Sequence, residues 1–551
     1  MTPSISSSLT PTPTPTPTTS LRRWAQTLAV TLMVGTAGIA GLLAIPAHAQ
    51  TLRWSSSGDP LTMDPHSQNE LMTNIMNAQV YERLLSRDRQ LNLVPALATG
   101  WQQVSPTLWR FKLRTGVKFH DGTAFTADDV VFSIKRAQAP TSQLNNYALA
   151  CGEPVKIDDF TVEFRLKAVN PIFLQHLETV PMMSKAWSEK HKVTRPLDFK
   201  NREESHASMN ANGTGPYILA VRQPGVRTVH KRNPNYWGTF EGNVQESVFT
   251  PIANDATRLA ALVSGELDFV HDPAPRDIAR LRNTSGVKVV DGMENRIVFI
   301  GLDQARDELL YAGVKGKNPF KDIRVRRAMY QAIDIETIKT KLMNGLSVPS
   351  GALTPSPLAA YGDAELEKRL PYDLKAARAL MAEAGYAEGF EFTLDCPNNR
   401  YVNDEEVCQA VVGMWAKLGV KARLNAMPFG PFAQKFQNWD SSAYLLGWGV
   451  ATYDAQYSLQ SLVRTRTKGA DGNFNFSGVS NARVDELVDA MGVETDKAKR
   501  DAMIREALTI TRDQALVITL HHQMRPWAMK KNVTIVHNSN DAPKMYYANI
   551  K

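Results

Sequence analysis

From Gln50 onward the chain alternates short stretches of period-two hydrophobicity with longer stretches of helical periodicity, and this alternation constrains its fold most. Residues 109–113 place apolar side chains at every second position, which is typical of a half-buried strand. Thr126 then opens a helix with Asp129 at the third helical position, a carboxylate form of the capping box. Strands that alternate with helices predict α/β layers with mixed sheets.

The same alternation continues to the end of the chain, without a repeat of fixed period. A chain of 551 residues exceeds one simple domain, so we expect two or three packed lobes. Further strands are expected at 51–54, 117–119, 161–167, 217–221, 287–290, 297–302, 390–394, 420–424, 442–447 and 516–520. Further helices are expected at 69–85, 255–265, 323–333, 373–384, 404–418, 481–491 and 497–513.

The first 49 residues have the pattern of an export signal. Residues 1–20 are almost all Ser, Thr and Pro, and Arg22-Arg23 precede the uncharged stretch 28–45. Ala47-His48-Ala49 follows as a small-residue cleavage site, so we expect removal of 1–49 and a mature start at Gln50. An uncleaved membrane anchor is the alternative, although glycines interrupt the apolar stretch, which is barely long enough to span a bilayer. We therefore expect the mature protein to be exported to the periplasm.

Charge and motif content argue against several classes of function. The net charge of +8 falls to +6 (8 − 2) without Arg22 and Arg23, and the basic residues are scattered, so no nucleic-acid partner is expected. The chain lacks H-E-x-x-H and G-x-S-x-G. His521 and His522 are adjacent on an expected strand and so point to opposite faces. We therefore expect no enzyme activity, no metal site and no cofactor. We also expect the protein to be a monomer.

The three cysteines are Cys151, Cys396 and Cys408. An oxidising compartment allows disulfides. Cys396 and Cys408 enclose a short segment that begins with a turn-like Pro-Asn-Asn sequence, so we predict that they form a disulfide and that Cys151 stays free. A structural zinc site is disfavoured, since this pair lacks C-x-x-C spacing and a nearby histidine.

One stretch carries a family resemblance. Residues 108–122 read LWRFKLRTGVKFHDG and 126–130 read TADDV. These residues closely resemble the signature of the dipeptide/oligopeptide-binding family (family 5) of solute-binding proteins of bacterial ABC importers. Further segments of the mature chain agree in order: 212–217, 232–237, 259–268, 319–334 and 377–386.

The resemblance implies a two-lobed periplasmic-binding-protein fold of the class II type, with an extra α/β domain inserted in the first lobe. The first lobe would comprise 50–85, 208–295 and 524–551, the insert 86–207, and the second lobe 296–523. Residues 297–302 and 516–523 would be the crossing strands that act as hinges. It further implies a peptide or peptide-like ligand and permease subunits of an ABC importer as partners. A metal chelate, an opine or a glutathione-like solute is the alternative ligand.

The resemblance also points to ligand-binding residues in the loop that follows Gly447. The aspartate that pairs with a peptide's amino group in this family aligns with Ala451, and Asp454 would replace it if the loop is shifted. Trp448 and Tyr453 resemble the family's pocket aromatics, with core packing as the alternative role for Trp448.

Three further segments are candidate walls of the site. Arg400 could pair with a ligand carboxylate, because a guanidinium offers two parallel donors, or it could be an exposed turn residue. The loop from Met63 to Gln68 and the segment that ends at Tyr147 would supply the remaining walls.

Overall fold

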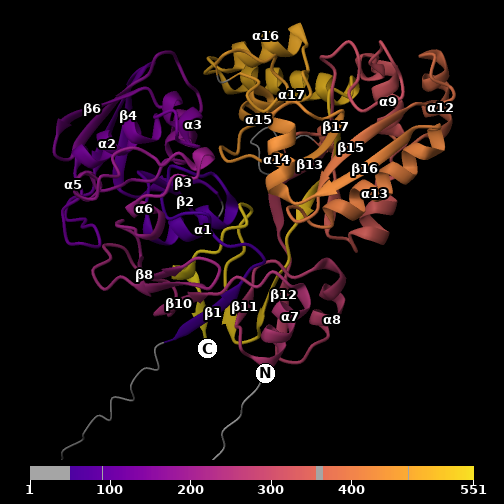
Figure 1. The fold of residues 1–551 in the computed structure, drawn as a ribbon. Coiled ribbons are helices and arrows are strands. Elements are labelled where there is room, and N and C mark those ends of the chain that lie inside the picture. Colours follow the sequence, from indigo (N-terminus) through magenta and orange to yellow (C-terminus); the bar gives the residue numbers. More distant parts are fainter. Residues whose placement is uncertain (1–49, 90, 355–363, 470) are drawn as a thin grey trace, which may run out of the picture. The chain divides into compact units, whose positions relative to one another are not determined.

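The structure is a computed structural model that describes residues 50–89, 91–354, 364–469 and 471–551. The expected signal segment 1–49 lies outside these residues. None of the helices in the described ranges is long and apolar enough to cross a membrane. Three main sheets organise the described chain (Figure 1).

The seven-stranded sheet is built from the two ends of the described chain and its middle. Its strand order is β12 (Val287–Val290), β19 (Trp527–Lys530), β11 (Phe269–Val270), β1 (Thr51–Ser55), β10 (Glu246–Phe249), β9 (Arg227–Arg232) and β8 (Tyr217–Gln223). β1 runs parallel to β10 and β11, and the other pairs are antiparallel, so the sheet is mixed. Trp54 packs between the rings of Phe249 and Phe269 in its core.

The six-stranded sheet uses the later part of the chain. Its order is β14 (Ser347–Pro349), β18 (Ile518–Met524), β13 (Met293–Leu302), β17 (Ala443–Gly449), β15 (Glu391–Pro397) and β16 (Lys421–Met427). β15 runs parallel to both β16 and β17. The chain passes from the seven-stranded sheet into β13 and returns from β18, and these two strands are paired. Everything between them is one continuous segment, so the two sheets are joined by two adjacent strands (Figure 1).

The four-stranded antiparallel sheet has the order β4 (Ala98–Ser105), β5 (Leu108–Leu113), β7 (Thr161–Arg165) and β6 (Glu153–Asp158). Phe111, Phe164 and Phe173 pack edge to face or tilted at its core. Short pairs form between β2 (Leu85–Arg87) and β3 (Leu93–Pro95), and between β20 (Val533–Thr534) and β21 (Asn549–Ile550). The domain limits stay a prediction, but 85/86, 295/296 and 523/524 fall inside β2, β13 and β18.

Helices surround these sheets. They are α1 (Leu71–Val80), α2 (Ala127–Ala137), α3 (Asn145–Ala150), α4 (Phe173–Leu177), α5 (Lys185–Lys190), α6 (His206–Met209), α7 (Asp255–Ser264), α8 (Ile278–Arg282), α9 (Ile323–Gln331), α10 (Ile335–Thr337), α11 (Ala364–Glu367), α12 (Leu374–Glu383), α13 (Asp404–Trp415), α14 (Phe429–Gln437), α15 (Ala455–Leu462), α16 (Ala482–Met491) and α17 (Lys497–Asp513). The predicted capping box at Thr126 and Asp129 is present at the start of α2. The helix expected at 69–85 ends earlier, at Val80.

Candidate functional site

The candidate site lies where three parallel strands of the six-stranded sheet end. β15, β16 and β17 end at Pro397, Met427 and Gly449, so the segments that follow them meet at one edge. Arg400 follows β15, and its guanidinium carbon lies 5.2 Å from the centroid of the Phe429 ring, which follows β16. The loop 450–454 follows β17. Ligands in α/β proteins bind beyond the carboxyl ends of strands, so this edge is the natural candidate.

Trp448 belongs to β17 and not to the loop that the sequence predicted. Its ring stacks on Tyr457 of α15 at 5.3 Å and meets Phe474 edge to face at 5.0 Å. The side chain is only 8 % exposed. Its indole Nε1 is buried and has no hydrogen-bond partner among the described residues. Buried indole donors usually have a partner, so an unused one at a strand end is a feature of interest.

Tyr147 extends the contacts of Trp448 toward the four-stranded sheet. Its hydroxyl donates to the Tyr457 hydroxyl at 2.7 Å, and the two rings lie 5.1 Å apart. Tyr147 comes from α3, whereas Tyr457 and Trp448 belong with the six-stranded sheet. We call Tyr147, Tyr457, Trp448 and Phe474 the aromatic row. It joins parts of the chain that are far apart in sequence.

Arg400 also makes a contact with a distant segment. Its Nη1 lies 3.8 Å from Oε1 of Glu70, the residue that caps α1. The other Glu70 oxygen accepts the backbone N–H of Thr73 at 3.1 Å. Within the described part of the chain, the buried Nε of Arg400 has no hydrogen-bond partner. The Arg400 side chain is 22 % exposed, so it is half-buried rather than freely exposed to solvent.

The neighbouring Tyr401 fixes the backbone beside Arg400. Its hydroxyl donates to the Gly447 carbonyl at 3.3 Å, and its ring covers the backbone of Gly447. A Cβ at position 447 would lie 2.5 Å from that ring, so only glycine allows this approach. The backbone N–H groups of Arg400 and Tyr401 both donate to the Asp404 carboxylate.

The loop 450–454 contacts β13 and a segment outside the six-stranded sheet. Val450 and Asn295 of β13 exchange two hydrogen bonds, of 3.1 and 2.6 Å. Tyr453 adopts a left-handed backbone conformation, with φ 58°, which costs energy for a residue with a side chain. The Arg87 guanidinium lies 4.3 Å from the centroid of the Tyr453 ring. Ala451, at the position where the resemblance implied an aspartate, is exposed.

Asp454 does not have the free carboxylate that the sequence argument required. Arg500 of α17 donates to both of its oxygens at 2.8 Å. Asp454 is also the N-cap of α15 and accepts the backbone N–H of Gln456 at 2.9 Å. Because this carboxylate is already neutralised inside the fold, the structure gives no support to its proposed pairing with a ligand ammonium group.

Of the predicted wall residues near Met63, the structure places one in the core. Met63 is fully buried with Trp54 and Ile75 against the seven-stranded sheet, so its side chain forms part of that core and not of a binding wall. Gln68 is half-buried.

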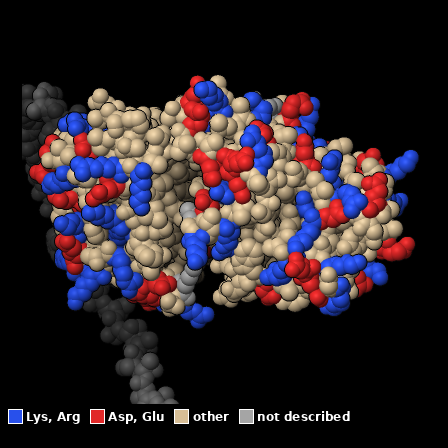
Figure 2. All heavy atoms as spheres, turned by 90° about the horizontal axis from the view of Figure 1, so that it is seen from above, with Lys and Arg blue, Asp and Glu red and all other residues tan. Residues whose placement is uncertain are grey.

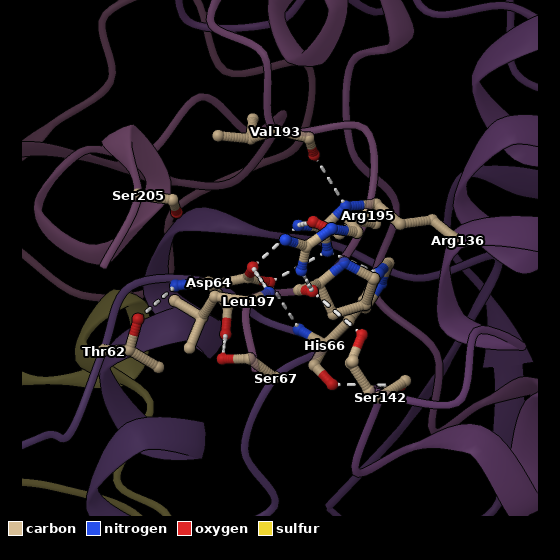
Figure 3. A network of polar contacts seen from close by, with 12 residues as sticks. Thr62, Asp64, His66, Ser67, Arg136, Ser142, Val193, Arg195, Leu197 and Ser205 are labelled. Atoms are coloured by element: carbon tan, nitrogen blue, oxygen red, sulfur yellow. Dashed lines mark hydrogen bonds and ion pairs between the residues drawn. The ribbon is translucent and has the colours of Figure 1, made fainter. Parts of the chain in front are cut away.

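A buried ion pair holds the loop that contains both residues (Figure 3). Arg136 of α2 donates to the two Asp64 oxygens at 2.9 and 2.7 Å, and both side chains have no exposure. Its remaining N–H groups reach the carbonyls of Val193 and Arg195 and the ring of His66. Burial alone would raise the pKa of Asp64, but the Arg136 guanidinium offsets this, and the pKa of Asp64 lies below its usual value.

His66 connects this ion pair to the aromatic row. Its Nε2 lies 2.9 Å from the Pro181 carbonyl, so it donates there, while Nδ1 faces the Arg136 donor. Burial and the adjacent Arg136 lower the pKa of His66 to about 4. The His66 carbonyl accepts the Ser142 hydroxyl and the Gln143 backbone N–H, just before the helix that carries Tyr147. The network therefore positions Tyr147.

The cysteines and two surface cavities complete the description of the predicted features. Cys396 at the end of β15 and Cys408 in α13 form a disulfide, and Cys151 is buried and free. Two surface cavities of about 340 and 360 Å³ are lined by residues between 128 and 222 and include no member of the aromatic row.

Sequence reasoning missed Tyr457, Glu70 and Phe429. Tyr457 lies on α15, a helix that was not predicted from the sequence. The signal was present, since Asp454 is an N-cap residue and Ala455, Leu459 and Leu462 follow at helical spacing. Glu70 and Phe429 join the site through tertiary contacts with Arg400, which no local pattern indicates.

Comparisons with known proteins agree with this architecture. The sequence pattern of the family described as bacterial extracellular solute-binding proteins, family 5 Middle, matches residues 92–470. The chain is 25 % identical to the dipeptide-binding protein of Escherichia coli (strain K12), over 89 % of this chain and 92 % of that protein. It is 27 % identical to di/tripeptide-binding protein 1 of Pseudomonas aeruginosa (strain UCBPP-PA14), over 91 % and 94 % respectively.

A solved structure shares the fold. The ABC transporter-associated periplasmic binding protein DppA from Helicobacter pylori, in complex with peptide STSA, superposes with a TM-score of 0.78 at 20 % identity. The match covers 91 % of this chain and 98 % of that chain, so the two-lobed α/β fold is common to both. With the family pattern matched over well over half of the sequence, the chain belongs to the bacterial extracellular solute-binding proteins of family 5.

Proposed function

We propose that this protein captures a peptide or peptide-like solute in the periplasm and delivers it to the permease subunits of an ABC importer. One observation carries the proposal: residues from separate parts of the fold converge at the carboxyl edge of the six-stranded sheet. Tyr147 meets Tyr457 there, and Glu70 faces Arg400. A solute that touches both parts is held best when they are close together, which favours a closed form joined through β13 and β18.

Mass spectrometry of the solute that co-purifies with the native protein tests this function. We expect one or a few small molecules, released by mild denaturation, that rebind to the emptied protein with a single-site calorimetric isotherm. Trp448→Phe and Arg400→Gln should weaken that rebinding, whereas the exposed Glu406→Gln should not. A native protein that yields no solute and binds no member of a peptide library would contradict the proposal.

A non-peptide solute is the second candidate, because relatives of similar identity differ in the ligands that their names state. Heme-binding protein A of Haemophilus influenzae is 26 % identical over 82 % of this chain. One glutathione-binding protein is also 26 % identical. A protein of the same fold was solved with agropinic acid and another with Ni(L-His). The co-purified solute decides between these classes.

The absence of catalysis, the monomeric state and the start of the mature chain belong to the same proposal. We expect no turnover of peptides during long incubation, and a monomer by light scattering. N-terminal sequencing of exported protein should begin at Gln50, and intact residues 1–49 in a membrane fraction would contradict cleavage. Charges of both signs alternate over the face seen in Figure 2, which favours a small solute over nucleic acid as the ligand.

A further inference from the structure

Arg87, the last residue of β2, connects two distant parts of the chain. Its Nε lies 3.3 Å from Glu178 Oε2, and both side chains are largely buried. Its Nη2 lies 3.5 Å from the Thr452 carbonyl oxygen, and its guanidinium lies over the Tyr453 ring. This ion pair therefore places two opposite charges beside the loop 450–454, and these two charges compensate each other.

Lys544 brings a second cation to the same place. Its Nζ lies 3.4 Å from the Arg87 carbonyl oxygen, and the side chain is half-buried. Gln79 of α1 holds the backbone on both sides of this lysine. It donates to the Pro543 carbonyl at 3.0 Å and accepts the Met545 backbone N–H at 3.1 Å. The fold thus fixes the position of Lys544 through its backbone and not through a charge partner.

Arg83 is the third cation. Its side chain is half-buried, and its buried Nε has no hydrogen-bond partner in the described ranges. Among the described residues, neither Arg83 nor Lys544 belongs to an ion pair. Burial lowers the pKa of Lys544, and the Glu178 carboxylate opposes this shift. The positive charges of Arg83 and Arg87 lower the same pKa further, so the three cations act on one another.

We call Arg83, Arg87 and Lys544 the basic cluster. With Glu178 as its carboxylate, the cluster carries a net charge of +2 (3 − 1). Cations that lose part of their hydration are normally paired, because an opposite charge offsets the cost of leaving water. A fold that holds this surplus in place, half-buried, creates a local potential that attracts an anion.

We propose that the basic cluster is an accessory binding site for a compact, doubly charged oxyanion of the phosphate or sulfate class. Arg83 and Lys544 would contact the anion, since neither has an ion pair, and Arg87 would add its charge from beside Glu178. A guanidinium offers parallel donors to such an oxyanion, and an ammonium group acts as a point charge. The bound anion would join the segment 83–87 to the C-terminal segment beside the loop 450–454. This site goes beyond the proposed function, because it requires no particular solute.

Calorimetry with inorganic phosphate, in chloride buffer of constant ionic strength, tests the site directly. We expect one-site binding to the wild type. Arg83→Gln and Lys544→Gln should each weaken it by about tenfold or more, as expected for the loss of a charged hydrogen bond. Arg280→Gln and Lys375→Gln remove exposed cations elsewhere, so these matched controls should change the affinity less than about twofold.

Thermal unfolding provides a second readout that also covers a poorly folded glutamine variant. Phosphate should raise the midpoint of the wild type by about 2 °C or more near saturation. Lys544→Met removes the charge but keeps an unbranched side chain. In chloride it should therefore raise the midpoint, because repulsion within the cluster falls, and it should lose the specific gain from phosphate. The general stabilisation by an excluded anion acts on every variant alike, so the comparison isolates the site.

A tripeptide with and without a phosphoserine distinguishes the two sources of the oxyanion. If the solute carries it, phosphorylation should tighten binding and inorganic phosphate should compete. If the oxyanion is free, phosphorylation should make no difference and phosphate should bind beside the peptide. A protein that binds neither peptide contradicts the proposed function alone, because the phosphate titration is independent of it. Absent phosphate binding in the wild type, or unchanged binding in both Arg83→Gln and Lys544→Gln, overturns the inference.

Discussion

The ion pair between Asp454 and Arg500 stabilises the fold. The pair is largely buried, with 16 % and 10 % side-chain exposure, and it links the start of α15 to α17. Asp454→Asn would leave the Arg500 charge without a counter-ion, so we expect the free energy of unfolding to fall by about 2–4 kcal/mol. Urea unfolding measures this. Asp489→Asn, at a 61 % exposed partner of Arg464, should cost under about 1 kcal/mol.

The solute affinity of Asp454→Asn separates the two roles of this carboxylate. We expect a Kd within about threefold of the wild type, because the carboxylate is used inside the fold. A tenfold loss of affinity with unchanged stability would show instead that Asp454 binds the solute.

The Trp448 ring makes apolar contacts, and its Nε1–H donor has no hydrogen-bond partner among the described residues. Two substitutions separate the contribution of the ring from that of the donor. Trp448→Phe keeps a ring against Tyr457 and Phe474 but removes Nε1. We expect a three- to tenfold rise in Kd, which is about 0.7–1.4 kcal/mol, with a small change in stability. Trp448→Ala should weaken binding by tenfold or more and also cost about 3–5 kcal/mol of stability, because it leaves a cavity. Unchanged affinity in Trp448→Phe would mean that the indole donor serves packing alone.

At the scale of elements, local chemistry in the sequence predicted the well-capped helices best. α17 was predicted with the limits that the structure has, and α2 with its capping box, because Asp496 and Thr126 satisfy the first N–H groups. α15 was missed because aromatic residues surround its start. The predicted strand 442–447 ended too early, because Gly447 was taken as its last residue. In the structure β17 continues through this glycine to Gly449, and the missing side chain makes room for Tyr401.

The candidate site was predictable only in part, for a physical reason. Trp448, Tyr147 and Arg400 were named from the sequence. In the structure Trp448 and Tyr147 both contact Tyr457, and Arg400 lies beside Phe429. Their partners Tyr457 and Glu70 come from distant segments, and only tertiary packing sets those contacts. Whether Asp454 was free or paired depended on Arg500, which is 46 residues away.

The disulfide ties the last residues of β15 to α13, directly beside Arg400. It closes a loop across a sequence separation of 12 residues, for which the chain-entropy model gives about 2–3 kcal/mol. Replacing both Cys396 and Cys408 by Ala should lower the free energy of unfolding by that amount. Thiol labelling of denatured, unreduced periplasmic protein should modify Cys151 alone. Three labelled thiols, or a double variant as stable as the wild type, would contradict the disulfide.

At the scale of the whole molecule, several histidines are buried in uncharged form in different parts of the fold. Burial lowers the pKa of His66 and His176 to about 4, and of His230 and His521 to about 3. In the unfolded chain each titrates near 6.5. The unfolded state therefore binds more protons as the pH falls below about 6.5, and the native state is destabilised progressively until the pH reaches about 4 to 3.

The pKa of His271 is shifted in the opposite direction. Burial alone would lower its pKa, but the Asp541 carboxylate, 3.3 Å away, raises the pKa above its usual value. Its contribution is present in full below pH 6.5 and is lost as the pH rises through the raised pKa. This one group offsets only part of the destabilisation by the four others at low pH.

We therefore expect the free energy of unfolding to be highest near neutral pH and to fall by several kcal/mol at pH 5. Each histidine with a lowered pKa destabilises the native state by about 1–2 kcal/mol at that pH. Urea unfolding from pH 8 to pH 4.5 measures the slope, and imidazole NMR signals should show four histidines that stay neutral at pH 5. His521→Asn should flatten the slope, because it removes one of the buried rings whose pKa is lowered. A stability that is constant from pH 7 to pH 5 would mean that these rings accept protons in the native state and that their burial is relieved by water.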